Sequence, residues 1–175
     1  MVSKLEKCKL YIFDLEGTLI NIPVDWEEVD RRIEVLIGTD PHPYQKKISV
    51  LPIKIKKKIF EIVDHWEKKA FKDASINING IEYLKKVSID NSIVIATLSG
   101  RKITDLSLKK LGIKDRISLV VTRNEKYPRN EQLKYILDIY QIDPSNIIFV
   151  GDRDIDEEAA YDIKCTFKNI NKVHQ

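Results

Sequence analysis

Two carboxylates and a glycine follow directly on an apolar run near the start of this 175-residue chain. The stretch KLYIFDLEGTLIN, residues 9–21, is mostly apolar up to Asp14, and Glu16 and Gly17 come immediately afterwards. A carboxylate can attack phosphorus as a nucleophile, and a second carboxyl can donate or accept the proton that such a reaction moves. Gly17 would let backbone amides approach an anionic group without a Cβ in the way. The stretch therefore points to phosphoryl chemistry at the end of a buried strand.

Acids, hydroxyls and cations also follow three later apolar runs. Thr97 and Leu98 follow Ser92–Ala96, Lys126 lies downstream of Ser118–Val121, and Asp152 and Asp156 follow Asn146–Val150. These runs are almost continuously apolar, which is typical of strands in a parallel sheet that is covered on both faces. Ligands bind beyond the carboxyl ends of such strands, so we expect these side chains to converge at one edge of the sheet.

The convergent set has a chemical use. Mg²⁺ prefers oxygen ligands, usually one or two carboxylates together with water and substrate phosphate, and Asp14 and Asp152 could supply the carboxylates. An anionic nucleophile needs both a metal and a cation to approach a phosphate, and Lys126 suits the cation. Thr97 can donate a hydrogen bond to a phosphate oxygen. The alternatives are Arg123 or Arg129 for the cation and Ser99 for the hydroxyl.

The elements that must position these residues alternate along the chain. Helical patterns occupy Arg101–Leu111, Asn130–Tyr140 and a segment that starts near Asp154, and two more runs, Lys9–Phe13 and the weaker Lys164–Phe167, complete the strands. Strands that alternate with helices predict right-handed crossovers and a doubly wound parallel sheet. The fold class expected is therefore α/β.

Residues 21–79 interrupt this alternation with two amphipathic helices. The segments VDWEEVDRRIEVLIG and PIKIKKKIFEIVDHWEKKAF place apolar residues three or four apart, and Asp25 with Glu28 reads as a capping box at the start of the first. The intervening TDPHPY is predicted to be a loop. The predicted organisation is a core of residues 1–20 and 80–175 with a small all-helical cap at 21–79, hinged near Leu19–Ile22 and Asn77–Gly80.

Composition and charge limit the classes of function. The chain is 43% hydrophobic and 33% charged, and its net charge of +3 is too small to argue for nucleic acid. No apolar run approaches a membrane span, and the first ten residues are charged where a secretion signal would be apolar. The two cysteines, Cys8 and Cys165, lack metal-ligand spacing. We expect a cytoplasmic protein that binds a small anionic ligand, neither nucleic acid nor a membrane.

Four motifs taken in order resemble those of the haloacid dehalogenase (HAD) superfamily: IFDLEGTLI, IVIAT, the downstream Lys126, and FVGDRDIDEEAA. The resemblance covers most of the chain outside residues 21–79, where many members of that superfamily carry a small helical cap. It implies a Rossmann-like sheet with the nucleophile strand at its centre. It also implies a Mg²⁺-dependent phosphatase of small phosphorylated metabolites, similar to phosphoglycolate phosphatases, that works through an aspartyl-phosphate.

The same resemblance implies a role for each motif residue. Asp14 would be the nucleophile, and Glu16 would be the general acid and base at a position where phosphatases usually have Asp, although enolase-phosphatases show a similar Asp-x-Glu-Gly-Thr. Lys126 would be the motif cation, in a segment that lacks the common Lys-Pro pair. The phosphate-binding set is Gly17, Thr18, Thr97, Leu98 and Lys126, and the metal set is Asp14, Glu16 through its carbonyl, Asp152 and Asp156.

Other activities compatible with these motifs are a sugar phosphomutase and a HAD-like phosphate-binding or regulatory protein without turnover. Dehalogenation is disfavoured, because members that dehalogenate lack an acid at the position of Glu16 and need no metal. A receiver-type signalling domain would carry its phosphorylated Asp after the third strand, where this chain has Thr122 and Arg123. The expected assembly is a monomer or a homodimer.

Overall fold

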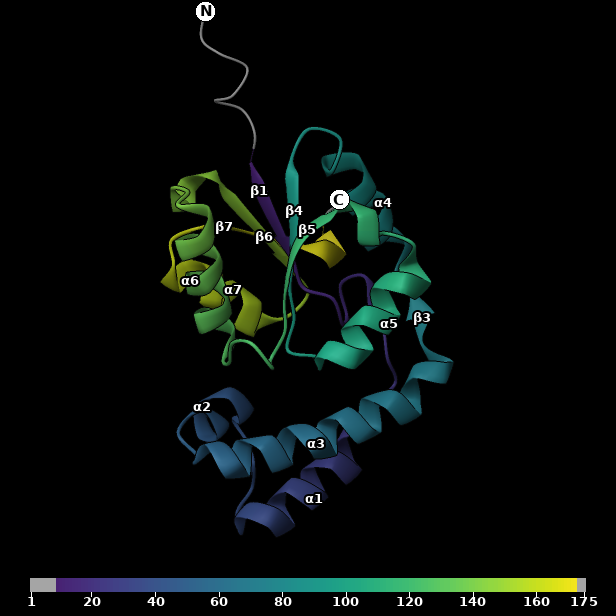
Figure 1. Ribbon diagram of the computed structural model, residues 1–175, viewed down its shortest axis with the longest axis vertical. Helices are drawn as coiled ribbons and strands as arrows, with labels where there is room; N and C mark the ends of the chain where they lie inside the picture. Colours follow the sequence, from purple (N-terminus) through teal and green to yellow (C-terminus); the bar gives the residue numbers. More distant parts are fainter. Residues whose placement is uncertain (1–8, 173–175) are drawn as a thin grey trace, which may run out of the picture.

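A five-stranded parallel sheet forms the centre of the protein (Figure 1), in a computed structural model that describes residues 9–172. The spatial order of its strands is β5-β4-β1-β6-β7, so the first strand is central. The strands are β1 (Leu10–Phe13), β4 (Ser92–Ala96), β5 (Ile117–Val121), β6 (Ile147–Gly151) and β7 (Thr166–Asn169). The predicted doubly wound α/β fold is confirmed. Cys8 lies outside the described residues.

The strand sequences explain why both faces of this sheet are covered. Along β4, Ile93 and Ile95 belong to one buried apolar cluster, whereas Val94 and Ala96 belong to a second. Successive strand residues point to opposite faces, so an uninterrupted apolar run supplies two cores at once. Helices α4 (Ile78–Val87) and α5 (Arg101–Leu111) pack into the first cluster, and α6 (Arg129–Tyr140) and α7 (Asp154–Asp162) into the second.

The chain leaves the central strand in two directions. From β1 it proceeds to β4 and then β5 on one side, and from β6, the other neighbour of β1, it proceeds outward to β7. The strand order therefore reverses between β1 and β6. Ligands of open α/β sheets bind at the carboxyl ends of the strands at such a reversal.

Three helices between β2 (Ile20–Asn21) and β3 (Ser75–Ile76) form the cap, which lies beyond the carboxyl ends of the sheet (Figure 1). They are α1 (Trp26–Ile37), α2 (Tyr44–Ser49) and α3 (Ile53–Ala70). Half of the predicted capping box begins the first helix: the Asp25 carboxylate accepts a hydrogen bond from the Glu28 backbone N–H at 3.1 Å, but the Glu28 carboxylate pairs with Arg31 and Arg32 instead of the Asp25 N–H. Helix α2 was missed, because TDPHPY reads as a loop and only six helical residues follow it.

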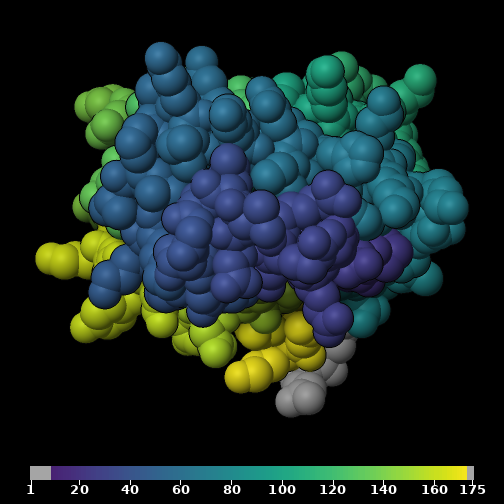
Figure 2. All heavy atoms as spheres, turned by 90° about the horizontal axis from the view of Figure 1, so that it is seen from below, coloured from purple at the N-terminus to yellow at the C-terminus, as the bar shows by residue number. Residues whose placement is uncertain are grey.

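The cap has an apolar core of its own and a narrow connection to the sheet. Val29 and Ile33 of α1 pack with Ile48 of α2 and with Ile59 and Val63 of α3. The two connecting segments pair with each other, since β2 and β3 form a short antiparallel ribbon. Seen from the cap side, α1 and the α2–α3 segment cover the centre of the molecule (Figure 2).

Short 3₁₀ helices complete the described chain, and the termini of the longer helices follow simple local rules. Helix α5 ends at Gly112, whose φ of +64° is the left-handed conformation that glycine adopts without strain. The 3₁₀ segments are Phe71–Asp73, Lys114–Arg116, Pro144–Asn146 and Ile170–Lys172. Within residues 9–172, every helix is too short or too polar to cross a membrane.

Candidate active site

Three aspartates meet where the strand order reverses. Asp14 follows β1, Asp152 follows β6, and Asp156 lies in the first turn of α7. Each offers one carboxylate oxygen, and these oxygens lie within 4.8 Å of one another. Asp14 and Asp156 are fully buried, and Asp152 is half-buried. The structure therefore brings together the three aspartates that the sequence predicted as metal ligands.

The turn after β1 holds Asp152 in place. Gly17 has a φ of +83°, and a Cβ built on it would lie 2.3 Å from the Asp152 carboxylate. The Thr18 hydroxyl donates to Asp152 at 3.2 Å, and the Asn77 amide donates to the Gly17 carbonyl at 3.3 Å. A residue with a side chain at position 17 would be strained and would displace Asp152. In this structure Gly17 and Thr18 thus contact Asp152, an acid of the candidate metal site. The sequence had predicted that both residues bind phosphate.

Glu16 lies on the same turn but outside the group of three aspartates. Its carboxylate accepts a weak hydrogen bond from the Ile22 backbone N–H at 3.5 Å. Burial raises the pKa of Glu16 from 4.5 to about 7; the Arg153 guanidinium opposes this shift, and the neighbouring Asp14 carboxylate adds to it. A carboxyl with a pKa near neutrality can both give and take a proton at physiological pH.

A buried arginine supplies the cation nearest to Asp14. Arg129, the first residue of α6, is 1% exposed, and its guanidinium lies 2.8 Å from the Asp14 carboxylate and 3.0 Å from Asp156. The same side chain donates to Gln132 at 2.9 Å and to the carbonyl of Ala96 at the end of β4. Arg129 thus fixes two of the aspartates relative to the neighbouring strand.

The structure does not bring Lys126 to this cluster. Lys126 is exposed, and its ammonium group lies 4.9 Å from the centre of the half-buried Tyr135 ring of α6. Helix α6 starts three residues later, at Arg129. The buried Arg129 side chain donates to the Ala96 carbonyl at the end of β4. The sequence left Arg123 and Arg129 open as alternatives, and the structure places Arg129 at Asp14.

Arg153 is a further cation that sequence reasoning missed. Its guanidinium donates to the second oxygen of Asp14 at 3.4 Å. The pKa of Arg153 is raised, because the surrounding acids, Asp14 first among them, outweigh the opposing effect of burial. The signal was present in the sequence, since Arg153 directly follows Asp152 at the end of a strand.

The loop after β4 carries two of the predicted phosphate-binding residues, Thr97 and Leu98. Thr97 is fully buried, and its hydroxyl oxygen accepts a hydrogen bond from the Ser99 backbone N–H at 3.1 Å. The Leu98 carbonyl accepts a hydrogen bond from Arg123 at 2.6 Å. Because β4 pairs in register with β1, this loop leaves the sheet beside Asp14. We refer to residues 97–100 as the phosphate loop, after the role that the sequence predicts for Thr97 and Leu98.

The charges of the site favour a bound cation. Burial, followed by the Asp14 charge, raises the pKa of Asp152, and burial raises the pKa of Asp156 to about 6 even though Arg129 opposes the shift. Carboxylates that resist ionising together lose that resistance when a divalent ion lies between them. Three clustered carboxylates without sulfur or imidazole donors form a set of oxygen ligands that fits Mg²⁺.

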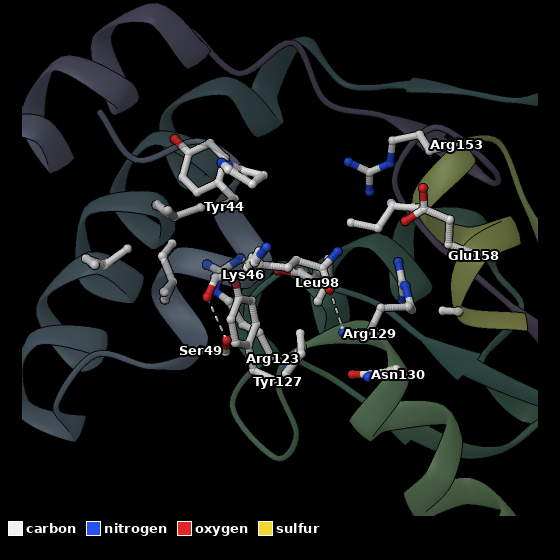
Figure 3. A pocket seen from close by; sticks show the side chains of 18 of the residues that line it. Tyr44, Lys46, Ser49, Leu98, Arg123, Tyr127, Arg129, Asn130, Arg153 and Glu158 are labelled. Atoms are coloured by element: carbon white, nitrogen blue, oxygen red, sulfur yellow. Dashed lines mark hydrogen bonds between the residues drawn. The ribbon is translucent and has the colours of Figure 1, made fainter. Parts of the chain in front are cut away.

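A pocket of about 660 Å³ opens between the cap and the core, with Arg129 and Arg153 in its wall (Figure 3). Both arginines contact Asp14, although the three aspartates themselves do not line the pocket. More than half of the lining side chains are apolar or aromatic, including Tyr44 and Phe60 of the cap and Tyr127 of the core. The pocket can therefore hold the organic part of a ligand whose anionic group faces the arginines.

The sequence profile of the haloacid dehalogenase-like hydrolases matches residues 27–170 of this chain. The match spans well over half of the sequence, so the chain belongs to this family. This confirms the resemblance that the four motifs indicated. No curated protein matched the sequence.

Solved structures share the fold at low sequence identity. A haloacid dehalogenase-like family hydrolase from Streptococcus pneumoniae is 16% identical with a TM-score of 0.65, over 93% of this chain and 84% of that one. A provisionally named phosphoglycolate phosphatase from Lactobacillus plantarum is 16% identical with a TM-score of 0.69, over 92% and 85%. A provisionally named β-phosphoglucomutase from Thermotoga maritima is 17% identical with a TM-score of 0.62, over 92% and 84%.

Proposed function

We propose that this protein is a Mg²⁺-dependent phosphatase of small phosphomonoesters and that Asp14 is its nucleophile. The observation that carries the proposal is the cluster of Asp14, Asp152 and Asp156, with the Arg129 guanidinium in contact with two of its members. Family membership supports hydrolysis in general. The buried carboxylates, the adjacent phosphate loop and the pocket support phosphate esters in particular.

The mechanism uses two carboxyl groups in turn. Asp14 attacks the phosphorus, the bond from phosphorus to the leaving oxygen breaks, and Glu16 gives that oxygen its proton. Glu16 then accepts a proton from water as the water oxygen attacks the phosphorus on Asp14, which releases inorganic phosphate and restores both carboxyl groups. A pKa of about 7 suits Glu16 to both steps.

The remaining charged groups bind and orient the phosphate. Asp14, Asp152, Asp156 and the Glu16 carbonyl would hold Mg²⁺, which when bound neutralises the phosphoryl oxygens as Asp14 approaches. Arg129 takes the cationic role for which the sequence had nominated Lys126. The Thr97 hydroxyl and the Leu98 backbone N–H would donate to the phosphoryl oxygens, since the N–H groups of Thr97, Ser99 and Gly100 already have acceptors.

The pocket should accommodate the leaving group. Phosphoglycolate is the first compact candidate, because a structural neighbour carries that activity in its name. The walls formed by Tyr44, Phe60 and Tyr127 would also accept a larger apolar or ring-bearing leaving group. A substrate panel should therefore contain both kinds of ester.

The proposal is tested by assaying this panel after chelation and again after metal is restored. Activity should vanish in excess chelator, return with Mg²⁺ and be inhibited by Ca²⁺, which accepts a looser and higher coordination. Asp14→Asn should abolish turnover while the circular dichroism spectrum stays unchanged. Full activity in chelator would refute the metal requirement, and an active Asp14→Asn would refute the nucleophile.

The same panel separates the two alternative functions. A phosphomutase would return the phosphoryl group to a sugar phosphate, so isotope-labelled phosphate would remain on sugar in place of being released as inorganic phosphate. A binding or regulatory protein would bind phosphate with Mg²⁺ but hydrolyse no ester on the panel, activated aryl esters included.

A further inference from the structure

A buried ion pair joins the cap to the core. Glu67 of α3 and Arg123, which follows β5, are each 4% exposed. Their side chains are joined by two contacts, from the Arg123 nitrogens to the Glu67 oxygens, of 2.8 and 3.0 Å. The Asp64 carboxylate, one turn earlier on α3, contacts the same guanidinium. The pair lies between two units that are linked along the chain by the β2–β3 ribbon and that also meet where Gln45 accepts from Arg129 and where Phe60 packs on Tyr127.

Both members of this pair also bind the phosphate loop. A Glu67 carboxylate oxygen accepts a hydrogen bond from the Gly100 backbone N–H at 3.2 Å, and Arg123 donates to the Leu98 carbonyl at 2.6 Å. The cap lies so close that a Cβ on Gly100 would be 2.1 Å from an Asp64 oxygen. The loop is thus held at two points by a charged pair of which one half belongs to the cap.

We propose that Glu67 is a positioning residue through which the docked cap sets the geometry of the phosphate loop. The inference rests on the phosphatase function proposed above, since it assumes that this loop binds the phosphoryl group. Docking the cap would then prepare the phosphate site whatever leaving group the pocket contains.

Docking of the cap on the core would not by itself require a buried ion pair. A buried ion pair often contributes no more stability than a well-packed apolar pair of similar volume, because both charges must be removed from water. Only a side chain with two acceptor oxygens can receive the Arg123 donors and the Gly100 N–H together. The Glu67 carboxylate therefore accepts hydrogen bonds from Arg123 and Gly100, which an apolar side chain of similar volume could not do.

The test measures inorganic phosphate, which has no leaving group for the cap to recognise. Affinity for phosphate is measured by calorimetry in saturating Mg²⁺ for the wild type, for Glu67→Gln and for Glu61→Gln, an exposed glutamate on the same helix. One Glu67 oxygen accepts from both Gly100 and an Arg123 nitrogen, and the other oxygen accepts from the second Arg123 nitrogen. Glutamine loses the charge and puts an amide N–H donor in place of one oxygen, so at least one Arg123 nitrogen would face a donor. We expect Glu67→Gln to bind phosphate about tenfold more weakly or worse, and Glu61→Gln to bind like the wild type.

A double variant separates positioning from stability. Glu67→Met with Arg123→Met removes both buried charges, so its melting temperature should recover relative to Glu67→Gln. Its phosphate affinity should stay low, because no acceptor is left for Gly100. Glu67→Asp keeps the charge on a shorter side chain and should weaken phosphate binding to an intermediate degree.

The kinetic constants give a second measure of positioning. In Glu67→Gln, KM should rise by a similar factor for compact and bulky esters, since the change acts on the phosphate they share. Wild-type phosphate affinity in either Glu67→Gln or the double variant would overturn the inference and leave the phosphatase function standing. A wild-type protein that neither binds phosphate nor hydrolyses any ester would overturn both.

Discussion

The core and the cap place their charged side chains by different rules. In the core, acids follow the carboxyl ends of β1 and β6 and Arg129 reaches them from the start of α6, so residues distant in sequence meet at one edge of the sheet. In the cap, the helices turn apolar residues inward onto one another, and a few polar side chains, among them Gln45 and Glu67, reach the core. If the proposed function holds, the chemistry belongs to the sheet, and the helices control access to the site and preference among substrates.

The largest effect should come from Glu16 of the core. Glu16→Gln should lower turnover of alkyl phosphates by about 10²–10⁴-fold, because their leaving oxygen needs a proton. An aryl ester such as nitrophenyl phosphate carries a good leaving group, so its first step should be much less affected while the second still lacks its base. Rapid quench with mass measurement should show a burst of nitrophenol and phosphate retained on Asp14. Equal losses for both esters without a burst would make Glu16 structural.

A somewhat smaller effect is expected when the core cation is removed. Arg129→Met should lower kcat by about 10²–10³-fold, since a buried guanidinium in contact with Asp14 is lost. Lys126→Met is the matched control, because Lys126 lies against the Tyr135 ring at the surface, and it should leave kcat near the wild-type value. The opposite ranking would return the catalytic cation to Lys126.

The cap should change preference more than turnover. Phe60 of α3 lines the pocket and packs against Tyr127, with the ring centres 5.3 Å apart. Phe60→Ala should lower kcat/KM for bulky or ring-bearing esters by about tenfold and change it little for a compact ester. His65→Ala, an exposed change on the same helix, is the control. Parallel losses on all esters would show that the cap supports the chemistry itself.

The smallest effect is a dependence of stability on pH in the metal-free protein. Glu16 titrates near 4.5 when unfolded and near 7 when folded, so between these values the folded state keeps a proton that the unfolded state has lost. Raising the pH through this window should therefore lower the free energy of unfolding by on the order of 1–3 kcal/mol.

Denaturant titrations at pH 5, 6 and 7.5 measure this slope. The slope should shrink in Glu16→Gln, which cannot ionise, and also in saturating Mg²⁺, because a bound cation favours the ionised carboxylates. The exposed Glu61→Gln should keep the wild-type slope. A slope unaffected by Glu16→Gln would place the titrating group elsewhere, with Asp156 the next candidate.

The helix termini and the site show how far local sequence reasoning reaches. Helix α5 and strand β4 were predicted to the residue, because an apolar run or stripe with a glycine stop is a local signal. The meeting of Asp14, Asp152 and Asp156 also followed from reading what comes after each strand. Helix α2 could not be predicted from the sequence. Its few apolar residues form a buried face only because α1 and α3 pack against them.

By itself, the sequence determined the α/β class, the existence of the cap and the acids at the strand ends, because strand and helix periodicities and strand-end position are properties of neighbouring residues. The tertiary structure alone decided which cation reaches Asp14. Lys126 and Arg129 are three residues apart. Because α6 starts near the end of β4, the Arg129 side chain points into the protein, whereas Lys126 stays at the surface. It also decided that Glu67 of the cap meets Gly100 of the core, since that contact depends on how a helix docks on a loop thirty-three residues away.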